Sequence, residues 1–234
     1  MIFTQIISDL KSLKNPEKID RFKRFFKTGP GQYGEGDEFY GLTLPQIHSI
    51  ERKYWQKVDF DDIKKLLDHP VHEFRTLAMM FLARLFTKAN SEKQKQIYDF
   101  YLANTARINN WDLVDISAGK IVGTYLLDKP RHILYKLAKS KLVWDRRIAI
   151  ISTFAFIRSD QFADTLKISE SLLTDKHDLI HKAVGWMLRE VGKRDLKTLT
   201  TFLDQHAPVM PRTALRYAIE KLPESQRQHY LSLK

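Results

Sequence analysis

Apolar residues recur at helical spacing along most of the 234-residue chain. In residues 72–86 the apolar side chains follow one another at intervals of three and four: Phe74, Leu77, Ala78, Phe81, Leu82 and Leu85. This spacing places them on one face of an α-helix. The shorter segment 60–69 precedes it, with Asp59 or Asp61 as the residue that caps its start. Because Pro70 ends one helix and lets another begin, the sequence predicts a helix pair.

The same arrangement recurs four more times. Each pair has a first segment followed by a more apolar one: 91–104 with 109–126, 129–140 with 143–158, 159–173 with 177–192, and 195–205 with 207–222. We expect the more apolar helix of each pair to form the inner layer. We therefore predict an all-α fold, a right-handed solenoid of HEAT-like helical repeats with a concave basic groove, in a single domain of residues 1–234.

A repeat interval also connects residues that could carry chemistry. Four side chains recur at intervals of 35 or 36 residues: Arg75, Trp111, Arg147 and Lys182. Asp115 follows Trp111 by one helical turn, and Trp186 follows Lys182 in the same way. Stacked helix pairs place equivalent positions in a row along one face. We therefore expect four of these residues to share one concave surface: Trp111, Asp115, Arg147 and Trp186.

Asp115 has the strongest case for a chemical role. The positions 36 residues before and after it are Met79 and Ile151, both apolar. A carboxylate in an apolar row loses hydration unless it is paired or functional. The alternative is a surface ion pair with a nearby Lys or Arg. Asp112 is rotated off this face, so we expect it to cap the helix start or to meet solvent.

Trp111 and Trp186 are the candidate aromatic side chains of this surface. A tryptophan in an amphipathic helix usually packs in the core. Trp111, however, stands at the position that Arg75 and Arg147 occupy in neighbouring repeats, and we expect neither arginine to lie in the core. An indole in a row of cations suits a platform for a base, a sugar or a cation.

Arg147 is the leading cation of the series. Arg146 and Arg147 point about 100° apart on a helix, so only one of them can face the surface, and the interval selects Arg147. A guanidinium there can bind a phosphate through two hydrogen bonds. The alternative is a bridge between neighbouring helices, with Asp115 as one partner. Lys182 and Arg189 are further candidate phosphate contacts.

The charge balance favours a polyanionic partner. The chain has 39 Lys and Arg against 28 Asp and Glu, a net charge of +11 and a pI near 9.6. Nucleic acid comes first among such partners, because several cations fall in the repeat interval. The N-terminal residues lack the apolar core of a signal peptide, and no stretch is apolar enough to span a bilayer. We therefore expect a cytoplasmic protein that has no membrane partner.

Searches for a metal site or an activated nucleophile find no convincing motif. The chain has no cysteine, which excludes disulfides and cysteine nucleophiles. His177 and His181 are one helical turn apart, but no third ligand is in view, and a polar helix face is the better interpretation. The zinc-hydrolase, GxSxG and deaminase motifs are absent. We therefore expect no metal and no cofactor.

Residues 28–43 interrupt the helical pattern and hold five of the nine glycines: Gly29, Gly31, Gly34, Gly36 and Gly41. They lack the Lys-Ser/Thr that ends a phosphate-binding loop. Two interpretations are equally good. The segment is an ordered surface loop joining the N-terminal helices, or it contacts the ligand, since glycines permit close approach of the backbone.

Three motifs together resemble the AlkD-like branch of the DNA alkylation repair glycosylases. They are WDLVD at 111–115, WDRRIAI at 144–150 and HKAVGWMLRE at 181–190. The resemblance covers nearly the whole chain. It implies HEAT-like repeats and a monofunctional DNA-3-methyladenine/7-methylguanine N-glycosylase, which excises cationic alkylated purines from duplex DNA without base flipping. We expect a monomer that binds double-stranded DNA containing alkylated bases and needs no metal or cofactor.

The resemblance also implies roles for individual residues. The catalytic set would be Asp115, Trp111, Trp186 and Arg147, with the two indoles against the deoxyribose and Asp115 as the catalytic carboxylate. The expected DNA contacts are Arg147, Lys182, Arg189, Arg75 and Thr43. The chain departs from the best-known members in having Phe25 or Phe26 where they have Tyr, Thr43 where they have Gln, and His48 where many have Arg.

Two other functions fit the same pattern. A noncatalytic binder of branched or distorted DNA would use the same basic groove but would not need Asp115. A helical-repeat protein scaffold would show little salt-sensitive affinity for DNA, whereas a phosphate-binding groove loses affinity steeply with salt.

Overall fold

The computed structural model describes residues 2–233, and the chain forms two compact units, Met1–Ser117 and Ala118–Lys234. Among the described residues the regular structure is helical; no β-strand forms, and an isolated parallel bridge joins Glu38 to Val71. The all-α class is therefore confirmed. The solenoid, its basic groove and the single domain stay predictions.

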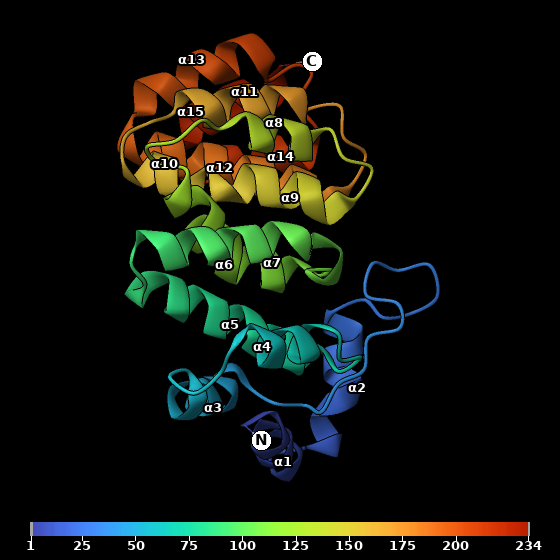
Figure 1. The fold of residues 1–234 in the computed structure, drawn as a ribbon. Helices are drawn as coiled ribbons and strands as arrows, with labels where there is room; N and C mark the ends of the chain where they lie inside the picture. Colours follow the sequence, from blue (N-terminus) through green and yellow to red (C-terminus); the bar gives the residue numbers. More distant parts are fainter. Residues whose placement is uncertain (1, 234) are drawn as a thin grey trace. The chain divides into compact units, whose positions relative to one another are not determined.

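The helices of the first unit run from blue to green in Figure 1. They are α1 (Ile2–Ser12), α2 (Pro16–Phe25), α3 (Leu44–Tyr54), α4 (Phe60–Leu67), α5 (His72–Lys88), α6 (Ser91–Ala103) and α7 (Trp111–Ala118), with a 3₁₀ turn at Thr105–Arg107. The Asp59 carboxylate caps α4 by accepting the Asp62 N–H at 2.8 Å. Of the two residues proposed for this cap, Asp59 is the one that forms it.

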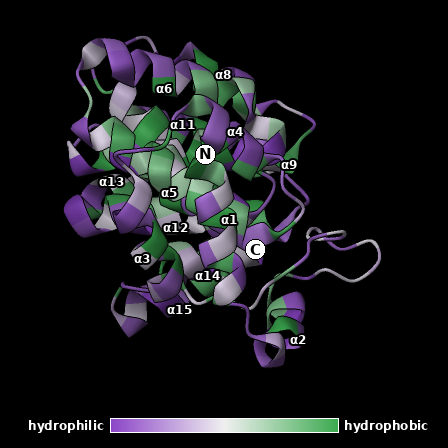
Figure 2. Cartoon of the chain, turned by 60° about the horizontal axis from the view of Figure 1, so that its bottom comes forward, coloured by the Kyte–Doolittle hydropathy of each residue, from purple (hydrophilic) through white to green (hydrophobic). Residues whose placement is uncertain are grey.

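α5 is the central helix of the first unit. It packs against α3, α4 and α6, and most of its side chains are buried, with Phe74, Leu77 and Phe81 fully inaccessible. Figure 2 shows α5 as largely green and white, while α2 carries more purple. Burying each large apolar side chain contributes roughly 1.5–3 kcal/mol. The prediction that the second helix of this pair forms the inner layer is confirmed.

The second unit runs from green to red in Figure 1. It begins with a π-helical segment at Gly119–Gly123 and continues through α8 (His132–Ala138), α9 (Val143–Ser152), α10 (Phe154–Arg158), α11 (Ala163–Ser171), α12 (Asp178–Arg194), α13 (Leu196–His206), α14 (Arg212–Ala218) and α15 (Glu224–Ser232). α12 is its central helix and packs against α9, α10, α11, α13 and α14. A Cβ on Gly185 of α12 would lie 2.3 Å from the Ala214 carbonyl oxygen, so only glycine permits this packing.

Segment 143–158, predicted as one helix, consists of α9 and α10. The break lies at Thr153, whose backbone N–H and hydroxyl both bond to the Ile150 carbonyl, at 3.1 and 2.7 Å. This tight turn replaces the regular i→i−4 bond, and the sequence pattern could not show it because both helices keep their apolar spacing. Between residues 2 and 233, no helix is both long and apolar enough to cross a membrane.

Candidate functional site

An aromatic cleft of about 350 Å³ opens in the first unit. α2 and the residue after it supply one group of lining side chains: Phe22, Phe25 and Phe26. The other lining side chains come from residues 39–47, α5 and α7: Phe39, Leu42, Leu44, Ile47, His72, Glu73, Thr76, Trp111, Asp112, Asp115 and Ile116. Two of the four predicted catalytic residues, Trp111 and Asp115, therefore line one cleft.

Trp111 is held by aromatic contacts from the end of α2. Its ring stacks on Phe26 with centroids 5.6 Å apart and planes at 19°, and it meets Phe25 edge-on at the same distance. Phe26 in turn stacks on Phe39 at 5.2 Å. Phe25 is 59 % exposed, so the aromatic wall reaches the surface. The indole is thus oriented by its neighbours and remains partly accessible.

Asp115 lies one helical turn after Trp111 in α7 and lines the same cleft. Its side chain is partly exposed, while Leu113 and Val114 of the same turn are buried. The cleft therefore combines a carboxylate with a largely apolar, aromatic lining. A carboxylate in such surroundings can stabilise nearby positive charge more strongly than one in bulk water.

A buried polar cluster lies against the cleft. His72, the first residue of α5, places Nδ1 3.2 Å from Asp37 Oδ2 and Nε2 2.9 Å from Asp112 Oδ2. The His72 side chain is 2 % exposed, and its ring packs against Phe26 and Phe39. Arg75 Nη2 donates to Asp37 Oδ1 at 2.5 Å. Two carboxylates and two cationic groups thus neutralise one another; three of them are buried, and the Asp112 side chain is 15 % exposed.

The carboxylates of this cluster shift the protonation of His72. Burial disfavours the imidazolium, but the charge and hydrogen bond of Asp112, with the hydrogen bond of Asp37, raise the pKa of His72 to about 9. Burial also opposes ionisation of Asp37, yet the His72 hydrogen bond and the Arg75 charge keep the pKa of Asp37 below its usual value. The sequence suggested that Asp112 caps the start of α7 or meets solvent. In the structure its carboxylate instead forms an ion pair with His72.

The glycine-rich loop is anchored to the start of α5. Glu73, which is 2 % exposed, accepts the backbone N–H groups of Tyr40, Gly41 and Leu42 at 2.8–3.2 Å. His72 N–H donates to the Glu38 carbonyl at 2.8 Å. Gly41 has φ +79° and its Cβ would lie 2.3 Å from the Asn15 carbonyl oxygen, so this position requires glycine. The loop is ordered by these bonds, and it also delivers Asp37 and Phe39 to the cluster and cleft.

Arg75 does not lie on a surface. It is 5 % exposed, donates from Nη1 to the carbonyls of His69 and Pro70 at 3.0 and 3.1 Å, and pairs with Asp37. The expectation that Arg75 lies outside the core is wrong. The periodic pattern could not show this, because the carboxylate that neutralises the buried guanidinium belongs to a loop 38 residues upstream.

The 36-residue interval also misaligned the helices. The inner helices begin at His72, Trp111, Val143 and Asp178, which are unequally spaced. Counted from these starts, Asp115 corresponds to Thr76 and Arg147, not to Met79 and Ile151. Arg75 likewise corresponds to Arg146. Connecting segments of unequal length break the register, since only position within the helix fixes where a side chain points.

Arg147 and Trp186 belong to the second unit. Arg147 is 5 % exposed, and its Nη1 donates to the Leu179 carbonyl at 2.5 Å, so it lies in the core contrary to expectation. Trp186 is partly exposed; its Nε1 donates to Glu190 Oε1 at 3.2 Å and its ring lies 6.2 Å from that of Phe154. Their sharing of one surface with Trp111 and Asp115 stays a prediction.

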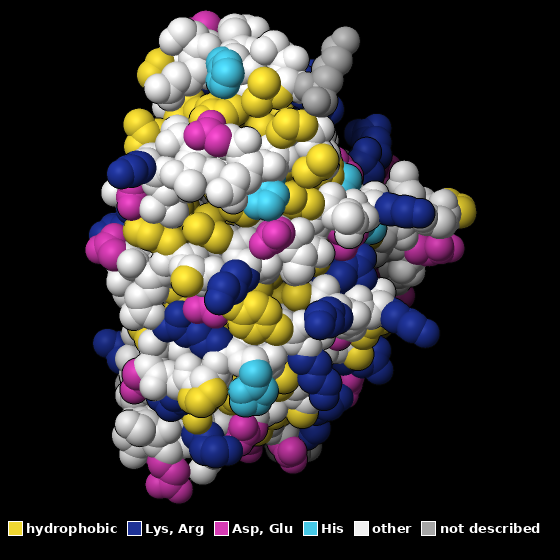
Figure 3. Space-filling view, turned by 90° about the horizontal axis from the view of Figure 1, so that it is seen from above, with side chains coloured by type: hydrophobic (Ala, Val, Ile, Leu, Met, Phe, Trp, Pro, Cys, Tyr) yellow, Lys and Arg dark blue, Asp and Glu magenta, His cyan; other side chains and the backbone are white. Residues whose placement is uncertain are grey.

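The other proposed DNA contacts differ in how available they are. Lys182 has a 39 % exposed side chain and an i,i+4 ion pair with Asp178 at 2.6 Å. Arg189 pairs with Glu220 and lies 3.6 Å from Glu190. Thr43 caps α3 through a capping box with Gln46. On the face in Figure 3, dark blue Lys and Arg side chains stand among magenta Asp and Glu side chains.

Comparison with known proteins identifies the family. The family model described as "DNA alkylation repair enzyme" matches residues 6–222. The chain belongs to the DNA alkylation repair enzyme family.

Solved structures of similar fold come from two bacteria. A predicted DNA alkylation repair enzyme from Enterococcus faecalis has a TM-score of 0.71 and 16% identity, covering 90% of this chain and 97% of that one. The structure of smu.31 from Streptococcus mutans UA159 has a TM-score of 0.55 and 16% identity, covering 88% and 98%. Identities this low show the shared fold alone. A comparison with curated protein sequences finds no match.

Sequence reasoning missed the polar cluster of this DNA alkylation repair enzyme family member. His72, Asp37 and Asn110 lie on three separate segments, and no motif connects them. One signal was present: charged or polar residues occupy four of the first five positions of the otherwise largely apolar helix at 72–86. Among the described residues, no group of three or more His, Cys, Asp or Glu side chains has the arrangement of a metal site.

Proposed function

We propose that this chain is a DNA glycosylase that hydrolyses the N-glycosidic bond of cationic alkylated purines, such as 3-methyladenine and 7-methylguanine, in duplex DNA without flipping the base. The observation that carries the proposal is the aromatic cleft that contains both Trp111 and Asp115. Membership of the DNA alkylation repair enzyme family supports it. The basic composition suits a DNA partner.

The chemistry requires little from the protein. An alkylated purine already carries positive charge, so the bond from deoxyribose C1′ to the ring nitrogen breaks with its electron pair on a good leaving group. Positive charge then develops on the sugar, and Asp115 stabilises it electrostatically. Water adds to C1′ and loses a proton to complete the hydrolysis. The exposed part of the Trp111 ring adds attraction for the same developing charge.

The proposal also gives roles to residues of the second unit. Trp186 supplies a second aromatic side chain, and Arg147 helps to hold the DNA backbone, although its guanidinium already bonds to the Leu179 carbonyl. Lys182, whose side chain is 39 % exposed and paired with Asp178, is the proposed phosphate contact. Arg75 is bonded to Asp37 and to the carbonyls of His69 and Pro70 within the first unit, so the proposal gives it no contact with DNA.

The test is base release from defined duplexes. Wild-type protein in excess over a duplex with one 7-methylguanine releases the base, and Asp115→Asn slows release roughly a hundredfold or more, because the carboxylate charge is lost while the shape is kept. Binding of the duplex by Asp115→Asn stays close to that of wild type. Asp99→Asn, at an exposed carboxylate paired with Lys95 in the same unit, is the matched control and keeps wild-type activity.

Two outcomes contradict the proposal. If wild-type protein binds alkylated, mismatched and branched duplexes equally and releases no base, the chain is a noncatalytic DNA binder. If its affinity for DNA is weak and insensitive to salt, it is a protein scaffold. Release that persists unchanged in Asp115→Asn would remove the proposed role of this carboxylate while leaving glycosylase activity itself intact.

A further inference from the structure

His72 of the polar cluster lines the aromatic cleft but has no part in the proposed chemistry. His72 lies between two carboxylates that come from different segments, Asp37 of the glycine-rich loop and Asp112 of α7. Its ring is covered by Phe26, 4.5 Å away, and Phe39, 5.1 Å away. Both of these phenylalanines line the cleft. The histidine therefore touches three of the segments that form the cleft.

Both carboxylates reach the first turn of α7. Asp112 is the second residue of this helix and follows Trp111 directly. Asp37 Oδ2 also lies 3.3 Å from Asn110 Nδ2, and Asn110 Oδ1 accepts the Trp111 backbone N–H at 2.8 Å. Asn110 is fully buried. His72 thus holds the start of α7 directly through Asp112 and, through Asp37 and Asn110, at the Trp111 backbone.

The geometry favours a doubly protonated ring. Each ring nitrogen faces a carboxylate oxygen, which can only accept a hydrogen bond, so only the imidazolium can donate to both. Arg75 Nη2 also lies 3.5 Å from Nδ1, but its contact with Asp37 at 2.5 Å is far shorter. A neutral ring would leave one nitrogen lone pair facing a buried carboxylate, which costs free energy.

We propose that the His72 imidazolium is the positioning group of the cleft: by bridging Asp37 and Asp112 it fixes the first turn of α7, and with it the placement of Trp111 and Asp115. His72 itself touches no reacting atom. The inference rests on the proposed function only for its consequence in catalysis. The linkage between His72 and the cleft is a property of the folded protein alone.

The charged groups that face the His72 ring come from each element packed against it. Asp37 lies in the loop, Asp112 in α7 and Arg75 in α5, while the end of α2 contributes the aromatic ring of Phe26. Loss of the ring proton leaves the two carboxylates with Arg75 as their remaining cation. A neutral ring keeps one N–H and can donate to only one of the two carboxylates, so the bridge between Asp37 and Asp112 is broken and the start of α7 is held less firmly.

Nuclear magnetic resonance tests the linkage without DNA. In protein labelled with ¹⁵N at histidine and tryptophan, the His72 ring nitrogens report its protonation and the Trp111 indole N–H reports the cleft. Trp111→Phe and His72→Gln assign the two sets of signals. We expect the His72 ring to stay doubly protonated past neutral pH, and the Trp111 indole signal to shift with the same midpoint, near pH 9.

Asp112→Asn separates a positioning role from a general contribution to folding. This variant keeps the side-chain shape but removes one of the two carboxylates, so the His72 midpoint falls and the Trp111 signal moves with it to lower pH. Asp160→Asn, which breaks an exposed ion pair with Arg194 in the second unit, leaves both midpoints unchanged. If the Trp111 indole signal does not change as His72 titrates, the proposal is overturned, even if His72→Gln lowers stability.

Base release provides the second readout. With a 7-methylguanine duplex, the single-turnover rate constant of the wild type falls on the alkaline side with the His72 midpoint, and Asp112→Asn moves this fall to lower pH. At a pH below the midpoints of the wild type and of Asp112→Asn, the rate constant of His72→Gln is roughly tenfold to a hundredfold lower than that of the wild type. Small displacements of catalytic groups slow a reaction by such factors. If the wild type releases no base, the proposed function fails while the spectra still decide the positioning role.

Discussion

Arg75 and Arg146 occupy the same position, the fourth residue of an inner helix, in the two units. Each donates from Nη1 to the carbonyls five and six residues before it, and each pairs with an aspartate. Asp37 reaches Arg75 from an upstream loop, whereas Asp175 reaches Arg146 from the turn before α12. The same arginine thus fastens the start of an inner helix in both units.

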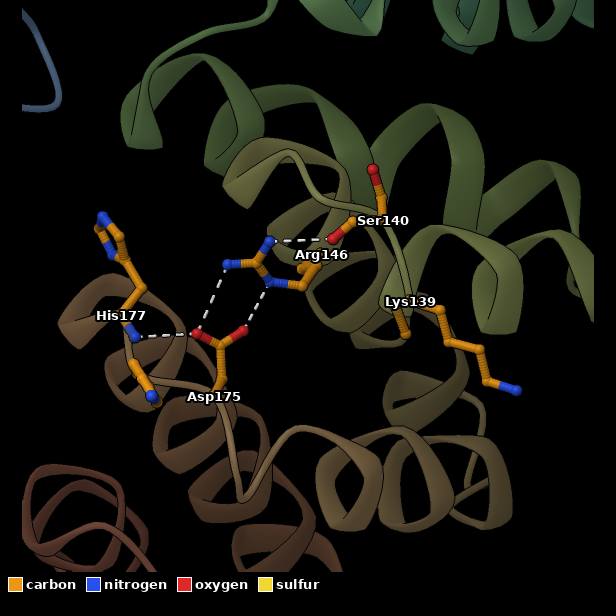
Figure 4. A pocket seen from close by; sticks show the side chains of 7 residues that line it. Lys139, Ser140, Arg146, Asp175 and His177 are labelled. Atoms are coloured by element: carbon orange, nitrogen blue, oxygen red, sulfur yellow. Dashed lines mark hydrogen bonds and ion pairs between the residues drawn. The ribbon is translucent and has the colours of Figure 1, made fainter.

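The surroundings of the two arginines differ. In the first unit His72 and Asp112 join the pair, and the aromatic cleft lies beside them; the Arg75 side chain is 6 % exposed. In the second unit, Figure 4 shows Arg146 and Asp175 at an open hollow near Lys139 and His177, and the Arg146 side chain is 18 % exposed. Both units therefore contain the arginine–aspartate pair, but only in the first unit does the aspartate come from the glycine-rich loop, which also lines the aromatic cleft.

Replacing the two arginines tests this comparison most directly. Arg75→Ala leaves Asp37 without its arginine in the core, and we expect a loss of about 3–5 kcal/mol in the free energy of unfolding. Arg146→Ala leaves Asp175 bonded to the His177 backbone N–H at 2.8 Å, beside an open pocket that water can enter, and we expect a loss of about 1–2 kcal/mol. Urea denaturation followed by circular dichroism measures both. Equal losses would mean that the glycine-rich loop does not strengthen the arginine–aspartate pair of the first unit.

The pH dependence of stability distinguishes the units next. The folded pKa of His72 is raised from 6.5 to about 9, so the stabilisation is fully present below about pH 6.5 and is lost as pH rises through 9. The full effect is on the order of 3 kcal/mol. In the second unit Val143 stands at the position of His72 and does not titrate.

Urea denaturation at pH 6 and pH 10 measures this effect. Wild type loses stability between the two values, and His72→Gln loses about 3 kcal/mol less over the same interval, because it has no imidazolium to deprotonate. His48→Gln, at an exposed histidine of the same unit, is the control and behaves like the wild type. An equal loss of stability between pH 6 and pH 10 in His72→Gln and in the wild type would contradict the raised pKa of His72.

Glu73 sharpens the comparison further, since Trp144 stands at its position in the second unit. Glu73→Gln keeps one acceptor for the three N–H groups of residues 40–42 but removes the charge, and we expect a loss of about 1–2 kcal/mol. Hydrogen exchange at Gly41 and Leu42 should accelerate. Exposed Glu92→Gln is the control, and unchanged exchange in Glu73→Gln would show that other contacts order the loop.

Two lysines give the smallest effect. Lys182 and Lys95 each form an exposed i,i+4 pair with an aspartate, at 2.6 Å in both cases, in the second and first unit respectively. Each pair adds only about 0.3–0.5 kcal/mol to stability. Lys182→Ala, however, should lower the salt dependence of DNA binding by about one unit of the logarithmic slope, because one phosphate contact is lost. Lys95→Ala should leave the slope unchanged.

The sequence by itself determined the helices and two residues of the cleft. Apolar spacing placed α5, and a one-turn interval joined Trp111 to Asp115, because both follow from the geometry of a single helix. It also showed where the helical pattern is interrupted, at residues 28–43. These properties are local, so a few neighbouring residues are enough to fix them.

Only the tertiary structure decided which polar residues are buried and what they bind. Arg75 was taken for a surface cation and lies in the core, while Asp112 was taken for a cap or a solvated side chain and pairs with His72. Asp37 brings these residues together from a loop 35 or more positions away. A charge can be buried only beside its partner, and that partner is fixed by the folded chain rather than by spacing along the sequence.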